Sequence, residues 1–197
     1  MKRKAVFIDR DGTLNVDAAY ASRYEQIAVY PESFEAVRKI NLAGLLAVVI
    51  TNQSAVGRGL LTEDDLSHIH ARLSASFADR SARLDAIYFC PHYVLSPDPR
   101  YGKECDCRKP NPGLALRAAA ELGIDLASSY MIGDKAEDII FGINIQAVPV
   151  LVLTGSGRES LTRLREQGLE PAYVAETILH AADWILDRER RQAHDPL

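Results

Sequence analysis

Short runs of consecutive apolar residues alternate along this chain with stretches in which apolar residues recur every three or four positions. Runs that are nearly continuous in apolar residues are typical of parallel strands buried on both faces of a sheet. Five runs fit this pattern: Ala5–Ile8, Ala47–Thr51, Ala86–Phe89, Tyr130–Ile132 and Val150–Leu153. Strands that alternate with helices predict βαβ units with right-handed crossovers. The predicted fold class is therefore α/β, with a doubly wound, mainly parallel, Rossmann-like sheet.

The stretches between these runs carry helical spacing and helix-end signals. Four helices are predicted, in chain order: one through Phe34, Val37 and Ile40 that stops near Gly44, one from the Thr62 N-cap through Phe77, one from Pro112 to Gly123, and one that begins near Ile178. The last helix is expected to fray into a charged tail at Arg188. We therefore expect a single domain over residues 1–187, followed by a tail over residues 188–197.

Composition restricts the partners of this chain. It has 197 residues, of which 47% are hydrophobic and 25% charged, and its formal net charge is −4. Proteins that bind nucleic acids or anionic membranes usually carry a basic excess, so we expect neither partner. No apolar run approaches the roughly 20 residues that span a bilayer, and no secretory signal follows the N-terminal Met-Lys-Arg-Lys. The odd number of cysteines, three, favours a reducing compartment. We expect a cytoplasmic monomer that acts on a small molecule.

The first predicted strand is followed by two aspartates, Asp9 and Asp11. Gly12 gives the chain freedom to bend, so that both carboxylates can face the crevice beyond the carboxyl ends of the strands, where ligands bind in such sheets. Paired carboxylates suit Mg²⁺, and one of them could attack phosphorus while the other transfers protons. An ordinary turn or cap pair is the alternative interpretation.

Polar residues also follow the second predicted strand. Thr51, Asn52, Gln53 and Ser54 offer hydroxyl and amide donors to an anion, although an ordinary polar loop has the same composition. Arg58, between two glycines, belongs to a flexible basic loop near the same edge of the sheet.

Charged residues stand at two further positions. Arg108 and Lys109 precede a predicted helix whose N-terminal N–H groups would add to a phosphate site. A solvated basic pair is the alternative. Asp134 follows the strand Tyr130–Ile132, where its carboxylate could complete a Mg²⁺ site, cap the next helix, or do both.

All three cysteines lie in two close pairs of potential metal ligands. Cys90 and His92 form one pair, Cys105 and Cys107 form the other, and the twelve residues Tyr93–Glu104 separate them. Three thiolates and one imidazole suit a tetrahedral structural Zn²⁺ with no open position, whereas unrelated reduced cysteines are the alternative. We predict a zinc-stapled loop over residues 90–107 that would be disordered without the metal.

The order of these motifs resembles that of the haloacid dehalogenase superfamily of phosphohydrolases: Asp9-Arg-Asp-Gly-Thr13, the strand-end Thr51, Lys109, and Gly133-Asp134 with Asp138 four residues on. The zinc loop that runs into Cys107-Arg-Lys-Pro110 is similar to two related branches. These are the D-glycero-D-manno-heptose 1,7-bisphosphate 7-phosphatases and the histidinol-phosphate phosphatases. The long zinc loop and three stretches favour the heptose branch: Asp9–Asp17, Thr51–Ser54 and Ser129–Lys135. Ala18-Ala19 departs from that branch, whose members often carry a more polar or glycine pair there.

The resemblance implies a capless fold of the haloacid dehalogenase type and Mg²⁺-dependent removal of the 7-phosphate, in nucleotide-heptose biosynthesis. It implies that Asp9 forms an aspartyl-phosphate and that Asp11 protonates the leaving oxygen and later activates water. Thr51 and Lys109 would hold the transferring oxygens. Mg²⁺ would bind the carboxylates of Asp9 and Asp134 and the backbone carbonyl of Asp11.

The resemblance also implies a set of substrate contacts: Asp17, Tyr20, Asn52, Gln53, Ser54, Arg58, Arg108 and Lys135. Arg108 is the first candidate for holding the second phosphate, and Arg58 is the weaker one. Lys135 and Asp138 are further expected to orient the metal site.

Two other functions stay open at this point. Histidinol phosphate is an alternative substrate. A non-enzymatic interaction protein could also use the same scaffold, although the intact Asp9, Asp11, Thr51, Lys109 and Asp134 argue against it. The net negative charge disfavours a nucleic-acid-binding zinc module.

Overall fold

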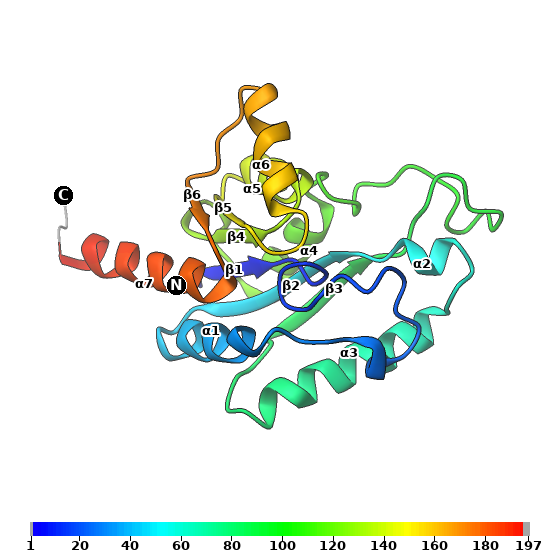
Figure 1. Cartoon of the computed structure of the whole chain (residues 1–197), viewed down its shortest axis with the longest axis horizontal. Helices are drawn as coiled ribbons and strands as arrows, with labels where there is room; N and C mark the ends of the chain where they lie inside the picture. The colour runs from blue at the N-terminus through cyan, green and yellow to red at the C-terminus, as the bar shows by residue number, and fades with distance from the viewer. Residues whose placement is uncertain (1, 195–197) are drawn as a thin grey trace.

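The computed structural model describes residues 2–194, and its centre is a six-stranded parallel sheet (Figure 1). The strand order is β3-β2-β1-β4-β5-β6, and each neighbouring pair is parallel. The strands are β1 (Ala5–Ile8), β2 (Leu46–Asn52), β3 (Ala86–Cys90), β4 (Tyr130–Gly133), β5 (Val148–Val152) and β6 (Tyr173–Ala175). The five predicted strands are confirmed with ends shifted by up to two residues, whereas β6 was not predicted.

Helices cover both faces of the sheet, as a doubly wound fold requires. Helices α1, α3 and α7 share one buried apolar cluster with the sheet, and α4 and α5 contribute to a second cluster on the opposite face. The helices are α1 (Pro31–Leu42), α2 (Ser54–Gly57), α3 (Glu63–Ala78), α4 (Gly113–Leu122), α5 (Ala136–Asn144), α6 (Gly157–Glu166) and α7 (Ile178–His194), with short 3₁₀ turns at Tyr24–Gln26 and Leu126–Ser128. The predicted α/β class is confirmed.

Helix α3 begins where its sequence signals indicate. The Thr62 hydroxyl accepts a hydrogen bond from the backbone N–H of Asp65, and the Asp65 carboxylate accepts one from the backbone N–H of Thr62. This reciprocal capping box satisfies donors that the first turn leaves unpaired. The apolar stripe of the helix, which includes Leu66, Leu73 and Phe77, is fully buried against the sheet.

Helix α7 does not fray at Arg188, so that prediction was wrong. The helix continues to His194, and residues 195–197 lie outside the described part of the chain. Glu189 explains the extra turns, since its carboxylate binds the Lys4 ammonium at 2.8 Å and accepts a hydrogen bond from the Tyr130 hydroxyl at 2.7 Å. These contacts fasten the charged end of the helix to the sheet.

The crevice for ligands lies where strand β1 separates the two halves of the sheet. Its neighbours β2 and β4 are reached by crossovers on opposite sides, so a crevice opens at their carboxyl ends. Ile8 pairs with Val49 on one side and Ile132 on the other, and the next residue, Asp9, donates its N–H to the Ile132 carbonyl at 2.9 Å. Within residues 2–194, no helix has the length and apolar character that a bilayer crossing needs.

Candidate active site

A cavity of about 920 Å³ opens at the carboxyl ends of β1, β2 and β4. The segment between β3 and α4, drawn in green in Figure 1, projects beside it and contributes part of its wall. Most of the residues predicted as site residues line this one cavity: Asp9, Asp11, Asp17, Tyr20, Thr51, Asn52, Gln53, Ser54, His92, Cys105, Arg108, Lys109 and Lys135. Folding therefore brings together motifs that lie more than 100 residues apart.

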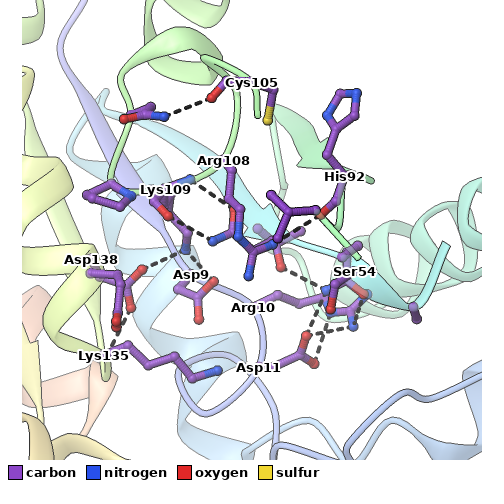
Figure 2. Close-up of a pocket in the computed structure, with 18 of the residues that line it drawn as sticks. Asp9, Arg10, Asp11, Ser54, His92, Cys105, Arg108, Lys109, Lys135 and Asp138 are labelled. Carbon is purple, nitrogen blue, oxygen red and sulfur yellow. Dashed lines mark hydrogen bonds and ion pairs between the residues drawn. The ribbon is translucent and has the colours of Figure 1, made fainter. Parts of the chain in front are cut away.

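A buried ammonium lies among carboxylates on the floor of the cavity (Figure 2). The Nζ of Lys109 lies 2.6 Å from Asp9 Oδ1 and 2.6 Å from Asp138 Oδ1, and it donates to the Ile50 carbonyl at 2.9 Å. Burial alone would lower the pKa of Lys109, but Asp138 and Asp9 outweigh burial and raise it. Lys109 is therefore a fixed cation next to the Asp9 carboxylate.

Carboxylates outnumber cations on the floor of the cavity. Burial raises the pKa of Asp9 to about 7, since the Lys109 ammonium offsets only part of the penalty and Asp138 adds to it. Burial, reinforced by Asp138, likewise raises the pKa of Asp134 to about 6. Ligand oxygens of Asp9, Asp134 and Asp138 lie within 4.8 Å of one another. A close set of hard oxygen donors with excess negative charge fits a divalent cation such as Mg²⁺.

Asp134 is held in a close-fitting cradle. Its Oδ1 accepts from the Thr13 hydroxyl at 3.1 Å, and its Oδ2 accepts from the Ser156 N–H at 2.8 Å. Gly12 has a φ of +92°, and a Cβ there would lie 2.3 Å from Asp134 Oδ2. Glycine is therefore required for both conformation and space. The backbone N–H of Lys135 bonds Asp138 instead of Asp134, so the alternative role of Asp134 as a helix cap is not observed.

Asp11 points away from Asp9 into a second polar network (Figure 2). Arg10 binds its carboxylate with two parallel hydrogen bonds, from Nε at 3.0 Å and from Nη2 at 2.7 Å. Asn15 and Gln53 donate two more, at 3.0 and 2.8 Å. Burial alone would raise the pKa of Asp11, but the Arg10 charge and these hydrogen bonds outweigh burial and lower it.

The residues at the end of β2 and directly after it mainly organise other site residues. Asn52 accepts from the backbone N–H of Lys109 at 3.0 Å and donates to its carbonyl at 3.2 Å, so its amide clamps the Lys109 backbone. Gln53 bridges Asp11 to the Thr51 hydroxyl, to which it donates at 2.9 Å. Ser54 begins α2 and lines the cavity.

The four predicted zinc ligands converge beside the cavity. The Cys107 Sγ lies 3.2 Å from Cys90 Sγ, 3.3 Å from Cys105 Sγ and 3.2 Å from His92 Nδ1. Ligand atoms this close, from three thiols and one imidazole, fit the coordination shell of a single Zn²⁺. Arg108 is tied to this cluster, because its Nη1 donates to the His92 carbonyl at 3.3 Å.

The rim holds the remaining predicted substrate contacts in two arrangements. Lys135 Nζ lies 3.2 Å from Asp17 Oδ2, and both residues line the cavity with Tyr20. Arg58 is not among the lining residues. Its guanidinium instead lies 3.7 Å from the ring centre of Tyr93 and 5.3 Å from that of Tyr20. Arg58 therefore joins two rim segments by cation–π contacts.

Comparison with known proteins agrees with this geometry. The "D-glycero-beta-D-manno-heptose-1,7-bisphosphate 7-phosphatase" of Pasteurella multocida is 41% identical over 178 residues, which cover 89% of this chain and 93% of the relative. The protein of the same name from Escherichia coli K12 is 38% identical and covers 93% of this chain and 88% of the relative. The chain belongs to the D-glycero-β-D-manno-heptose-1,7-bisphosphate 7-phosphatase family.

Solved structures support the same family. The D,D-heptose 1,7-bisphosphate phosphatase from B. bronchiseptica, complexed with magnesium and phosphate, superposes with a TM-score of 0.82 at 32% identity, covering 94% of this chain and 99% of that one. The family described as HAD-hydrolase-like matches residues 106–181. The predicted resemblance to this heptose phosphatase family is thereby confirmed.

The buried polar residues that were not predicted as site residues include Arg10 and His70. Arg10 is 2% exposed and binds Asp11, and His70 is 7% exposed and contacts Arg10. The signal for His70 was present in the sequence, since it lies on the apolar stripe of α3 between Leu66 and Leu73, where a polar side chain needs a partner. No sequence signal identifies which residue that partner is.

Proposed function

We propose that this chain removes the 7-phosphate of D-glycero-β-D-manno-heptose 1,7-bisphosphate. The observation that carries the proposal is the Asp9–Lys109 pair on the cavity floor of a chain that aligns with heptose bisphosphate 7-phosphatases over nearly its whole length. The β anomer is proposed because the relatives from P. multocida and E. coli are named for it.

In the first step, a carboxylate oxygen of Asp9 attacks phosphorus, and the bond from phosphorus to the sugar O7 breaks. Asp11 gives a proton to O7, so the sugar leaves as an alcohol. Lys109 and the Thr51 hydroxyl stabilise the charge on the transferring oxygens, since both are fixed in a buried site. In the second step, the Asp11 carboxylate takes a proton from water, which attacks the aspartyl-phosphate and releases phosphate and Asp9.

Two metals fit the residues that the structure brings together. Asp9 and Asp134, with the backbone carbonyl of Asp11, would hold Mg²⁺, which when bound neutralises phosphate charge. Asp138 is engaged by Lys109 and by the Lys135 N–H, so we assign it the task of orienting that site. Cys90, His92, Cys105 and Cys107 would hold a structural Zn²⁺ that orders the loop.

The second phosphate of the substrate needs its own cation, since only one phosphate fits against Asp9 and Lys109. We propose Arg108 for this role, because it lines the cavity next to Lys109 and its planar fork suits a phosphate. Asp17, Tyr20, Ser54 and Lys135 would contact the sugar and its phosphates from the rim. Asn52, Gln53 and Arg58 would support the site through their protein partners.

Phosphate release by the purified protein with Mg²⁺ tests the proposal, using the separated α- and β-bisphosphates and histidinol phosphate as substrates. We expect the highest kcat/KM on the β-bisphosphate and essentially no turnover by Asp9→Asn. A higher kcat/KM on histidinol phosphate would assign the chain to the alternative substrate. Unchanged turnover by Asp9→Asn would contradict the aspartyl-phosphate mechanism. Absence of turnover on all three substrates and on an aryl phosphate would favour the non-enzymatic function.

A further inference from the structure

Arg10 sets the position of the Asp11 carboxylate. Its side chain is buried, and its two parallel hydrogen bonds fix both the direction and the plane of the carboxylate. Arg10 Nη2 also donates to Gln53 Oε1 at 3.0 Å, and Gln53 in turn donates to Asp11. A displacement of the guanidinium would therefore move two of the three side chains that hold Asp11.

The far side of the same guanidinium is held by His70. Arg10 Nη1 lies 3.1 Å from His70 Nε2, in a buried contact between the end of β1 and helix α3. An arginine has only donors, so His70 Nε2 must accept, and the neutral imidazole then carries its proton on Nδ1. The ring also packs against Phe89, with ring centres 5.7 Å apart. His70 is thus an immobile acceptor behind Arg10.

His70 is one step removed from the reacting groups. It is absent from the lining of the cavity, so it has no access to substrate. Loss of its Nε2 would leave a buried N–H of Arg10 without this acceptor, and the guanidinium would have to shift or admit water to recover a hydrogen bond.

We propose that His70 is a positioning residue for proton transfer. By accepting from Arg10 it fixes the guanidinium that aims the Asp11 carboxylate at the leaving oxygen. This inference rests on the proposed function, in which Asp11 supplies that proton. The proton that Asp11 gives to the leaving oxygen is the one that its carboxylate takes from water in the second step of the preceding turnover. His70 acts on the position of that carboxylate.

Leaving-group dependence distinguishes this role from general support of the fold. An alkyl alcohol leaves phosphorus poorly unless it receives a proton, whereas 4-nitrophenolate leaves without one. The kcat/KM covers only steps through cleavage of the substrate bond, so hydrolysis of the aspartyl-phosphate does not enter it. A mispositioned Asp11 should therefore lower kcat/KM for alkyl phosphates and spare 4-nitrophenyl phosphate.

The experiment measures kcat/KM of the Mg²⁺-loaded enzyme on heptose bisphosphate, glycerol phosphate and 4-nitrophenyl phosphate. His70→Leu, which keeps bulk and removes the acceptor, should lose about 10-fold on the two alkyl substrates and less than about 2-fold on the aryl one. His70→Asn, whose amide is too short to reach Arg10, gives a second variant with the same expected pattern. His70→Gln, whose Oε1 replaces Nε2, should restore the alkyl activity to within about 3-fold.

Leu73→Ala is the matched control, because Leu73 is buried one turn further along α3 and contacts the apolar core. It should lower the melting temperature without changing the alkyl-to-aryl ratio. Equal losses on both substrate types in His70→Leu and His70→Asn, or failure of His70→Gln to restore the ratio, would overturn the proposal. If the wild-type protein cleaves glycerol phosphate but not heptose bisphosphate, the proposed substrate is wrong. The ratio of kcat/KM on glycerol phosphate to kcat/KM on 4-nitrophenyl phosphate would still decide the role of His70.

Discussion

The Nζ of Lys109 lies 2.6 Å from the Oδ1 of Asp9, and both side chains are almost completely buried. The two residues are 100 positions apart and come from different elements of the fold. Removal of one partner of an ion pair in such surroundings strongly destabilises the fold, because the other charge stays buried without compensation.

Lys109→Met should therefore damage both stability and activity. It removes the ammonium from between Asp9 and Asp138 while keeping most of the side-chain volume. We expect the free energy of unfolding to fall by about 3 kcal/mol, and kcat/KM to fall by at least about 100-fold because a fixed positive charge at the transferring phosphate is lost. Urea denaturation and phosphate release measure the two effects.

Lys39→Met is the matched control for this change. Lys39 pairs with Asp183 at the same 2.6 Å, but both side chains are partly exposed. Exposed pairs contribute about 1 kcal/mol or less, so its stability should change little and its activity not at all. Equal destabilisation by the two substitutions would contradict the importance assigned to burial of the Asp9–Lys109 pair.

The two metals should differ in how readily they leave the protein. Freshly purified protein should contain about one equivalent of zinc, and mild chelation should stop activity reversibly by removing Mg²⁺ alone. Zinc removal should instead expose the thiols of Cys90, Cys105 and Cys107 to a thiol reagent. Elemental analysis that finds less than about half an equivalent of zinc would contradict the structural site.

Arg108→Ala should affect the bisphosphate more than a small aryl phosphate. We expect kcat/KM on heptose bisphosphate to fall about 10–100-fold, the loss of one or two charge-assisted hydrogen bonds, and a much smaller change on the aryl substrate. Arg100→Ala, on the same loop but paired with Asp98 and not lining the cavity, should leave both values unchanged. An equal loss on both substrates in Arg108→Ala would show that Arg108 serves the reacting phosphate or the fold.

The sequence predicted those parts of the site that depend on short-range motifs. Asp9, Asp11 and Asp134 were expected at strand ends because apolar runs stop just before them, and a parallel sheet brings its carboxyl ends to one edge. The two ligand pairs of the zinc cluster were readable from spacing alone. Strand β6 was missed because its three residues form too short a run to have a clear pattern.

Contacts between elements far apart in the chain could not be predicted from the sequence. The sequence indicated only a basic loop near the site at Arg58, whereas the stacking of Arg58 on Tyr93 and Tyr20 depends on how two loops fold. The pairing of Arg10 with His70 likewise requires the packing of α3 against the end of β1, which no local propensity encodes. The late turns of α7 depend in the same way on contacts of Glu189 with Lys4 and Tyr130.

Stability should fall as the pH is lowered because of His70. Burial lowers the pKa of His70 from 6.5 to about 3 in the folded protein. The Arg10 charge also lowers it, by less than burial but by more than the Asp11 charge raises it. Between these values the unfolded chain binds a proton at this position and the folded chain does not, so protons favour unfolding. The penalty is about 1.4 kcal/mol per pH unit, or about 2 kcal/mol between pH 6.5 and 5.

Urea denaturation across this pH range, on wild-type protein and His70→Gln, isolates the effect. Glutamine does not titrate, so the stability of the variant relative to wild type should increase by about 2 kcal/mol as the pH falls from 6.5 to 5. Burial raises the pKa values of Asp9 and Asp134, so these two groups make the folded protein more stable as the pH falls. Wild type and His70→Gln both contain these groups, so their contribution cancels when the stabilities of the two proteins are subtracted. Leu73→Ala, on the same helix, removes no titratable group, so it is the matched control and should keep the wild-type pH dependence. Parallel stability curves for wild type and His70→Gln would contradict this prediction. They would mean that the His70 ring binds a proton equally well in the folded and unfolded states, despite its contact with the Arg10 guanidinium.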